Sequence, residues 1–178
     1  MSHGVRVRRA DVRDLPRIVE LRLALLDEHS DNPLYGRLRP DAEARAFDLY
    51  ASQLASHHEA MFVAEYAGVV IGILRCVDTP GSPLLHPERY CYVSSVYVEP
   101  AHRRRGVLRI LLRGAMEWCL ERGLDEMRLH NPAASPIAGP VWQALGFDVV
   151  EQVRRRKLTV TSSTPRPTPP PLVTVEAR

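Results

Sequence analysis

The residues best suited to chemistry lie at 96–112, where three consecutive arginines and a glycine separate a strand-like run from an amphipathic helix. The strand-like run stops at Pro100, and the helix starts at Gly106. A helix N-terminus presents backbone N–H groups and a positive dipole end, and arginine adds charge-assisted bonds to phosphate oxygens. Glycine relieves crowding where a ligand meets the backbone. The segment predicts a phosphate or pyrophosphate site, although not a P-loop, because no Gly-Lys-Ser/Thr follows.

The composition agrees with a discrete anionic ligand. Of the 178 residues, 45% are hydrophobic and 25% are charged, and the formal net charge is only +3. Arginines gather at 103–113 and 154–156, so the basic character is local. We do not expect nucleic-acid binding, since no recognised motif or interleaved aromatic residues accompany these arginines. A solvated basic helix start without a ligand is the alternative interpretation.

Other features narrow the class of protein. The three cysteines form no Cys-x-x-Cys pair, so we expect neither a disulfide framework nor a zinc cluster. Adjacent His57 and His58 would point apart on a helix, and we expect no metal. The N-terminus has no apolar segment behind its charges, and the apolar run at 69–74 is too short to span a bilayer. These observations predict a cytoplasmic protein without a membrane segment.

The elements that must position the arginine segment alternate between strands and helices. Periodicity predicts strands at 4–10, 61–67, 69–77, 90–98, 125–131 and 147–160. Helices are predicted from Asp11 to a stop at 31–33, and at 41–56, 106–122 and 135–145. This order predicts an α/β domain with a mixed sheet over residues 1–160. The proline-rich tail at 161–178 either ends in a last strand at 172–175 or is disordered.

Three segments resemble one family. The hydrophobic strand followed by Val-x-Pro and Arg-x-x-Gly-x-x resembles the acetyl-CoA-binding segment of the GNAT (Gcn5-related N-acetyltransferase) family. Met-Arg-Leu-His-Asn at 127–131 is similar to the family's fifth strand, and Val-Trp-Gln-Ala-Leu-Gly-Phe at 141–147 to the end of its fourth helix. The resemblance implies a GNAT-like mixed, mostly antiparallel sheet of six or seven strands with about four helices. It also implies acetyl-CoA as cosubstrate, with coenzyme A as product.

The same resemblance implies individual cofactor contacts. Backbone groups of Val96 and Val98 would bind the pantetheine arm, and Asn131 would lie near its thiol end. The pyrophosphate would be held by the loop whose members are Arg103, Arg104, Arg105, Gly106, Val107, Leu108 and Arg109. Leu108 departs from the small residue of the family pattern. We assign its side chain to the core, because it belongs to the apolar stripe of the helix.

The implied reaction is N-acetylation of a primary amine by direct attack in a ternary complex. The ammonium must first lose a proton, and the thioester oxygen needs a donor, for which the Val98 N–H is the family-guided choice. Strand alternation places Tyr92, Ser94 and Val96 on one cleft-facing side. Tyr92 or Ser94 would then orient a water that carries the proton away, unless both are ordinary strand residues. Glu99 is assigned to the solvated surface.

Other residues leave the chemistry open. Trp142 replaces the tyrosine that in many members protonates the thiolate, and indole is no acid at neutral pH, so we assign Trp142 to packing. Glu65 is a distant second candidate for the base. Because the sequence offers no clear general acid and no clear general base, an alternative function is a non-catalytic acyl-CoA-binding sensor or interaction module.

The acceptor would be a small-molecule or peptide amine, bound near residues 26–39 and 78–89. Asp27, Glu28 and Asp31 would attract a cationic amine, unless these acids are simply solvated. A homodimer is compatible with the resemblance, although no residue here predicts it.

Overall fold

The computed structural model describes residues 4–133 and 135–158. The chain divides into two units, Met1–Asp148 and Val149–Arg178, and the described helices and strands all belong to the first. The strands are β1 Arg6–Arg9, β2 Glu59–Tyr66, β3 Val69–Pro80, β4 Arg89–Val98 and β5 Met127–Leu129. The helices are α1 Leu15–Glu28, α2 Ala42–Ala55, α3 Val107–Glu121 and α4 Ala138–Ala144, and short 3₁₀ turns cover Val12–Asp14 and Pro100–His102.

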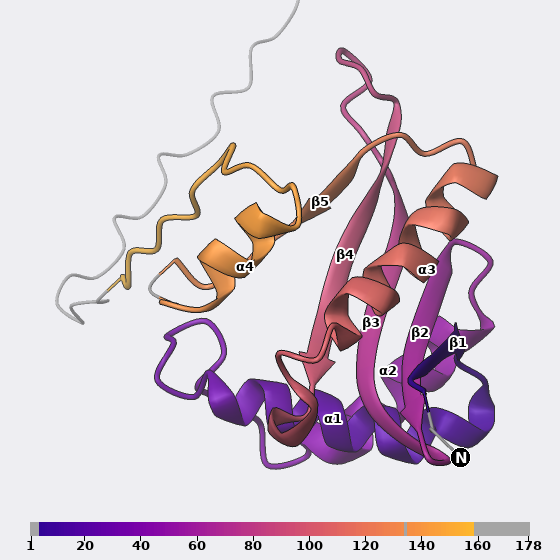
Figure 1. Cartoon of the computed structure of the whole chain (residues 1–178). Helices are drawn as coiled ribbons and strands as arrows, with labels where there is room; N and C mark the ends of the chain where they lie inside the picture. Colours follow the sequence, from indigo (N-terminus) through magenta and orange to yellow (C-terminus); the bar gives the residue numbers. More distant parts are fainter. Residues whose placement is uncertain (1–3, 134, 159–178) are drawn as a thin grey trace, which may run out of the picture. The chain divides into compact units, whose positions relative to one another are not determined.

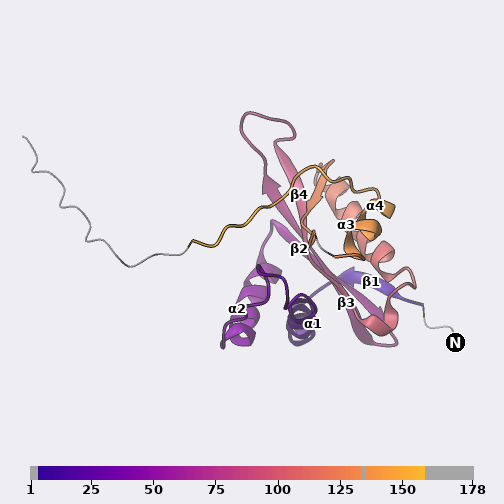
Figure 2. The ribbon, with the colours of Figure 1, turned by 90° about the vertical axis from the view of Figure 1, so that its left-hand side faces the viewer.

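The five strands form one mixed sheet in the order β1-β2-β3-β4-β5. Neighbours are antiparallel except for β4 and β5, which run parallel. The helix α3 covers one face and α1 and α2 cover the other (Figures 1 and 2). The α3 side holds a core that includes Leu74, Val93 and Leu111, and the α1–α2 side holds a second core around Ile18, Val63 and Ile73. The sheet thus separates two hydrophobic cores.

Among residues 4–133 and 135–158 the sheet has five strands, so the expectation of six or seven was wrong. The sixth strand was expected at 147–160, but residues 147–158 contain no strand. Alternating apolar residues favour a strand only where a neighbouring strand supplies hydrogen bonds and a core supplies burial. Val149 is 84% exposed and Val150 is 89% exposed, so this segment has neither. The tail at 161–178, with the strand expected at 172–175, lies outside the described residues.

The hairpin between β2 and β3 confirms the sequence expectation. Ala67 and Gly68 both have positive φ, at 50° and 82°. Two such residues in succession build the tight turn whose twist matches that of the flanking strands. The hairpin brings β3 alongside β4, the strand that leads into the arginine segment.

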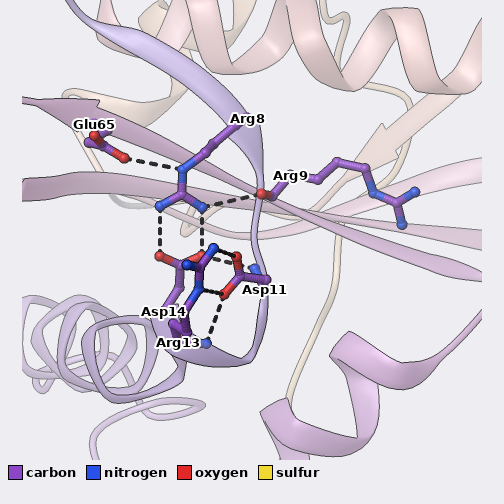
Figure 3. Close-up of polar contacts among 6 residues, drawn as sticks. All are labelled: Arg8, Arg9, Asp11, Arg13, Asp14 and Glu65. Carbon is purple, nitrogen blue, oxygen red and sulfur yellow. Dashed lines mark hydrogen bonds and ion pairs between the residues drawn. The ribbon is translucent and has the colours of Figure 1, made fainter. Parts of the chain in front are cut away.

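The start of α1 is tied to the sheet by a charged network (Figure 3). Arg8 of β1 donates from Nη1 and Nη2 to the carboxylate of Asp14, at 2.7 and 2.8 Å, and from Nε to Glu65 of β2 at 3.1 Å. Asp11 and Asp14 also form a reciprocal capping box. The network fixes where α1 leaves the sheet, and α1 carries residues of the candidate site.

Candidate active site

The strands β4 and β5 separate halfway along β4. Their last paired residues are Val93 and Leu129, so residues 94–98 of β4 have no strand on that side in the described part of the chain. Figure 1 shows β5 beside only the first part of β4. Glu99 donates its N–H to Ile71 of β3 at 2.9 Å, and alternation therefore turns the backbone groups of Val98 toward the open side. The strand offers an unpaired edge just before the arginine segment.

A bulge in β4 changes which side chains share a face. Ser94 pairs with Arg75 and Tyr97 with Ile73, so two residues of β4 lie opposite Leu74 alone. Ser95 takes φ of 51°, and its hydroxyl shares a 3.1 Å hydrogen bond with Tyr50 of α2.

This bulge corrects the expectation that Tyr92, Ser94 and Val96 share one face. Val96 packs with the core on the α3 side, whereas Ser94 bonds to Arg75 on the opposite side. The simple alternation fails because the bulge inserts one residue between Ser94 and Val96.

The loop before α3 has a row of backbone N–H groups without acceptors. Arg104 and Gly106 take positive φ, at 61° and 80°, and the first helical hydrogen bond is donated by Ile110. The N–H groups of residues 104–109 meet no acceptor among the described residues. Arg104 and Arg105 are exposed and form no ion pair there. These features place donors and positive charge together, as anion binding requires.

The side chain of Arg103 is turned back onto the protein. Its Nε donates to the Val98 carbonyl at 2.7 Å, and its Nη2 donates to Glu28 of α1 at 2.6 Å. The guanidinium also lies 5.2 Å from the ring centroid of Tyr97. Arg103 thus fastens the end of β4 to α1, and its guanidinium is already engaged in these contacts. Nothing local in the sequence pointed to Glu28, which is 75 positions away.

Leu108 packs against the α3-side core, in agreement with the assignment from its helical stripe. The next turns of α3 face a groove of about 380 Å³ toward α4. Its lining combines two arginines with apolar side chains: Arg109, Arg113, Leu112, Met116, Ala144 and Leu145. Such a lining suits an aromatic base that carries a phosphate.

The α1–α2 side of β4 carries a tyrosine–histidine pair at the point of strand separation. The Tyr92 hydroxyl and Nδ1 of His130 are 2.9 Å apart. Burial raises the pKa of Tyr92, so its phenol stays protonated at neutral pH. Ser94 accepts a 3.1 Å hydrogen bond from Arg75, which also pairs with Glu59 at 2.7 Å. The histidine is the member of this group that can take up a proton.

The remaining candidates are held in other contacts. Glu99 pairs with Arg17, and Glu65 pairs with Arg8, so both carboxylates are already engaged. Asn131 lies directly after His130 and donates to the carbonyl of the next residue at 3.2 Å.

Trp142 meets Phe147 edge to face, with ring centroids 5.3 Å apart, which agrees with a packing role.

A second hollow of about 700 Å³ lies away from this site. It is lined by residues of the β3–β4 loop and of the turn before β5: His86, Pro87, Glu88, Arg89, Gly123, Asp125 and Glu126. None of the catalytic or cofactor-binding residues expected from the sequence lines it, although residues 86–89 belong to the loop that was expected to lie near the acceptor. Within the described residues, no cluster of three or more histidine, cysteine or acidic side chains could hold a metal, and no helix is long and apolar enough to cross a membrane.

The strand edge, the donor-rich loop and the helix that follows are the features of one known class of protein. The family model of the acetyltransferase (GNAT) family matches residues 23–147. The chain belongs to this family, and it is an N-acetyltransferase.

Individual members of the family are similar to this chain over about half of its length. Aminoglycoside N(6')-acetyltransferase type 1 of Salmonella typhimurium is 29% identical over 107 residues, which cover 56% of this chain and 70% of the relative. N-acetyltransferase family 8 member 3 of Rattus norvegicus is 28% identical over 100 residues, covering 56% of this chain and 43% of the relative.

Solved structures share the fold at lower identity. An acetyltransferase from Clostridium acetobutylicum with acetyl-CoA superimposes with a TM-score of 0.70 at 21% identity, covering 86% of this chain and 96% of that one. The aminoglycoside N-acetyltransferase AAC(6')-Iy with CoA reaches 0.71 at 23% identity, covering 89% and 97%.

Proposed function

We propose that the protein transfers the acetyl group of acetyl-CoA to a primary amine by direct attack in a ternary complex. The observation that carries this proposal is the row of unsatisfied N–H groups at 104–109, which follows the unpaired edge of β4. CoA contains a pyrophosphate, a pantetheine arm with two amides, and an adenosine with a further phosphate. The segment from β4 to α3 offers a surface suited to each of these three parts: a strand edge for the pantetheine arm, a row of N–H groups for the pyrophosphate, and a groove with arginines for the adenosine phosphate.

The pantetheine arm suits the open edge of β4. Its amides alternate donors and acceptors, so it can add to a strand edge as an extended peptide does. The contacts would come from backbone groups of Val96 and Val98, although the Val98 carbonyl already accepts from Arg103. The pyrophosphate would meet the loop amides with Arg104 and Arg105. The adenosine phosphate would meet the groove that Arg109 and Arg113 line.

Bound acetyl-CoA supplies an activated acetyl thioester. The chain's own residues then have two tasks. The Val98 N–H, turned to the open side, would stabilise negative charge on the thioester oxygen. Tyr92 and His130 would lead the proton of the amine away, and Ser94 would hold Arg75 beside them. Placing both reactants beside this strand would supply further acceleration.

A pair of glycine substitutions tests the cofactor site. Gly106 has φ of 80°, and a β-branched residue there would force the loop out of the conformation that presents its N–H groups. A left-handed conformation costs a non-glycine residue about 1–2 kcal/mol. We expect Gly106→Val to raise the Kd of CoA about tenfold or more, measured by calorimetry.

Gly123 provides the matched control. It has φ of 69° at the other end of α3, and a Cβ at either glycine would meet no atom within 4 Å. Gly123→Val should therefore carry a similar backbone cost without weakening CoA binding. Equal CoA affinity for wild type and Gly106→Val would rule out this placement of the cofactor.

A further inference from the structure

A tyrosine of α2 reaches the bulge in β4 from the α1–α2 side of the sheet. Tyr50 is 3% exposed and belongs to the core on that side. Its hydroxyl lies 3.1 Å from the hydroxyl of Ser95, which is 9% exposed. Within residues 4–133 and 135–158 neither hydroxyl forms another hydrogen bond. Buried polar groups are normally paired, so each of these two hydroxyls depends on the other.

Ser95 has an unusual backbone conformation for a strand residue. Its φ is 51°, in the left-handed region that residues other than glycine seldom adopt. Among the described residues, two others that are not glycine have positive φ, Ala67 and Arg104, and both lie in turns between elements. A serine persists in such a conformation where its surroundings hold it there. The hydrogen bond from α2 supplies that hold for the Ser95 side chain.

The extra residue at the bulge sets the direction of the side chains that follow it. Val93 belongs to the core on the α3 side, and Ser94 faces the opposite side. Ser95 turns to the same side as Ser94, so Val96 and Val98 return to the α3-side core. In a regular strand alternate residues face alternate sides, and Val96 and Val98 would then share the side of Ser94. The bulge therefore decides which core the end of β4 contacts.

The same extra residue sets the direction of the backbone groups. Glu99 donates its N–H to Ile71 of β3, and the backbone groups of Val98 therefore point to the open side. Side chains and backbone groups alternate together along a strand, so a strand without the bulge would turn the Val98 N–H toward β3. The donor proposed for the thioester oxygen would then be lost from the open side.

We propose that Tyr50 is a positioning residue, which holds the bulge of β4 through Ser95 and thereby keeps the Val98 N–H on the open side. This inference rests on the proposed acetyl transfer and adds to it a residue of α2. Because Tyr50 is buried, it would contact neither acetyl-CoA nor the amine. Its removal should therefore lower kcat and leave KM for the amine unchanged.

Two substitutions at Ser95 separate the backbone conformation from the hydrogen bond. Ser95→Ala and Ser95→Gly both remove the hydroxyl, but glycine alone takes a positive φ without steric cost. The readout is CoA thiol release with whichever of kanamycin, spermidine, lysine and phenethylamine the wild type acetylates fastest. We expect Ser95→Ala to lower kcat about tenfold, and Ser95→Gly to exceed Ser95→Ala about threefold or more. A hydrogen bond that served stability alone would give both variants the same kcat.

Substitution of Tyr50 tests the other partner. Tyr50→Phe keeps the packing of the ring and removes the hydroxyl, so kcat should fall about tenfold. Adding Ser95→Gly to Tyr50→Phe should raise kcat again about threefold or more, because glycine holds the bulge without the hydrogen bond. Ser52→Ala, at an exposed serine of α2, is the control and should have no effect. Circular dichroism at the assay temperature should show every variant folded.

The outcomes separate this inference from acetyl transfer itself. Equal kcat in Ser95→Ala and Ser95→Gly, or a wild-type kcat in Tyr50→Phe, would overturn the role of Tyr50 and leave the proposed function standing. If the wild type acetylates no amine, the proposed function fails. Backbone NMR of wild type and Tyr50→Phe then decides about the bulge. Loss of the positive φ at Ser95 in Tyr50→Phe would support the hold by Tyr50, and an unchanged positive φ would overturn it.

Discussion

At the scale of single residues, the pair Tyr92–His130 carries the proposed acid–base chemistry. The two side chains come from neighbouring strands and meet at 2.9 Å, where those strands separate. Burial raises the pKa of the phenol, so in the proposed mechanism Tyr92 would relay a proton and not keep it. The imidazole nitrogen of His130 would be the acceptor at the end of that relay. Tyr92 was a sequence candidate, whereas His130 gained its role only from this contact.

Removing the imidazole should slow the reaction without weakening cofactor binding. General-base catalysis is worth about a hundredfold or more, so His130→Ala should lower kcat by about that factor. Tyr92→Phe should lower kcat less, because a water can replace the hydroxyl. Steady-state thiol release gives kcat and calorimetry gives the Kd of CoA, with His57→Ala as an exposed control. An unchanged kcat in His130→Ala would exclude the histidine as the base.

At the scale of elements, the position of α1 links the charged network of Figure 3 to the site. The side chain of Asp14 is only 8% exposed, and both of its carboxylate oxygens accept from Arg8. These hydrogen bonds lower the pKa of Asp14 even though burial alone would raise it. Farther along α1, Glu28 accepts a hydrogen bond from Arg103 of the arginine loop.

Removing the negative charge of Asp14 should destabilise the protein in a pH-dependent way. Asp14→Asn should reduce the free energy of unfolding by about 2–3 kcal/mol at pH 7, because Arg8 loses its ion pair. The unfolded pKa of aspartate is about 3.9 and the folded one is lower, so the contribution is complete above that value. It is lost as the pH falls through the folded pKa.

Urea denaturation at pH 7 and at about pH 3 measures the change. Asp48→Asn, on the exposed side of α2, is the control and should have little effect at either pH. A difference between wild type and Asp14→Asn that persists undiminished at the lower pH would contradict this account.

The elements also show what the sequence could and could not predict. The turn at Ala67 and Gly68 and the loop at Gly106 were predictable, because the glycines that favour positive φ lie at the turns themselves. The split between Ser94 and Val96 was not, since Ser95 of the bulge is hydrogen-bonded to Tyr50, which lies 45 positions away in the sequence. The alternation at 147–160 was typical of a strand, but a strand also needs a partner, which no local pattern supplies.

At the scale of the whole molecule, the sheet keeps two tasks apart. The α3 side and the open edge of β4 provide the surfaces proposed for the cofactor, whereas the α1–α2 side provides those proposed for the acceptor and its proton. The strand β4 is common to both, and its bulge turns Val96 to one side and Ser94 to the other. One strand thereby brings the two proposed reactants together.

The most direct test of this account is transfer of a labelled acetyl group. The full chain is incubated with acetyl-CoA deuterated in the acetyl methyl group and with pooled amines, and the products are analysed by mass spectrometry. We expect the labelled acetyl mass on a primary amine, with free CoA released in equal amount, and strongly reduced transfer in Gly106→Val. CoA binding without labelled amine in any pool would contradict the account and would instead support a non-catalytic acyl-CoA sensor.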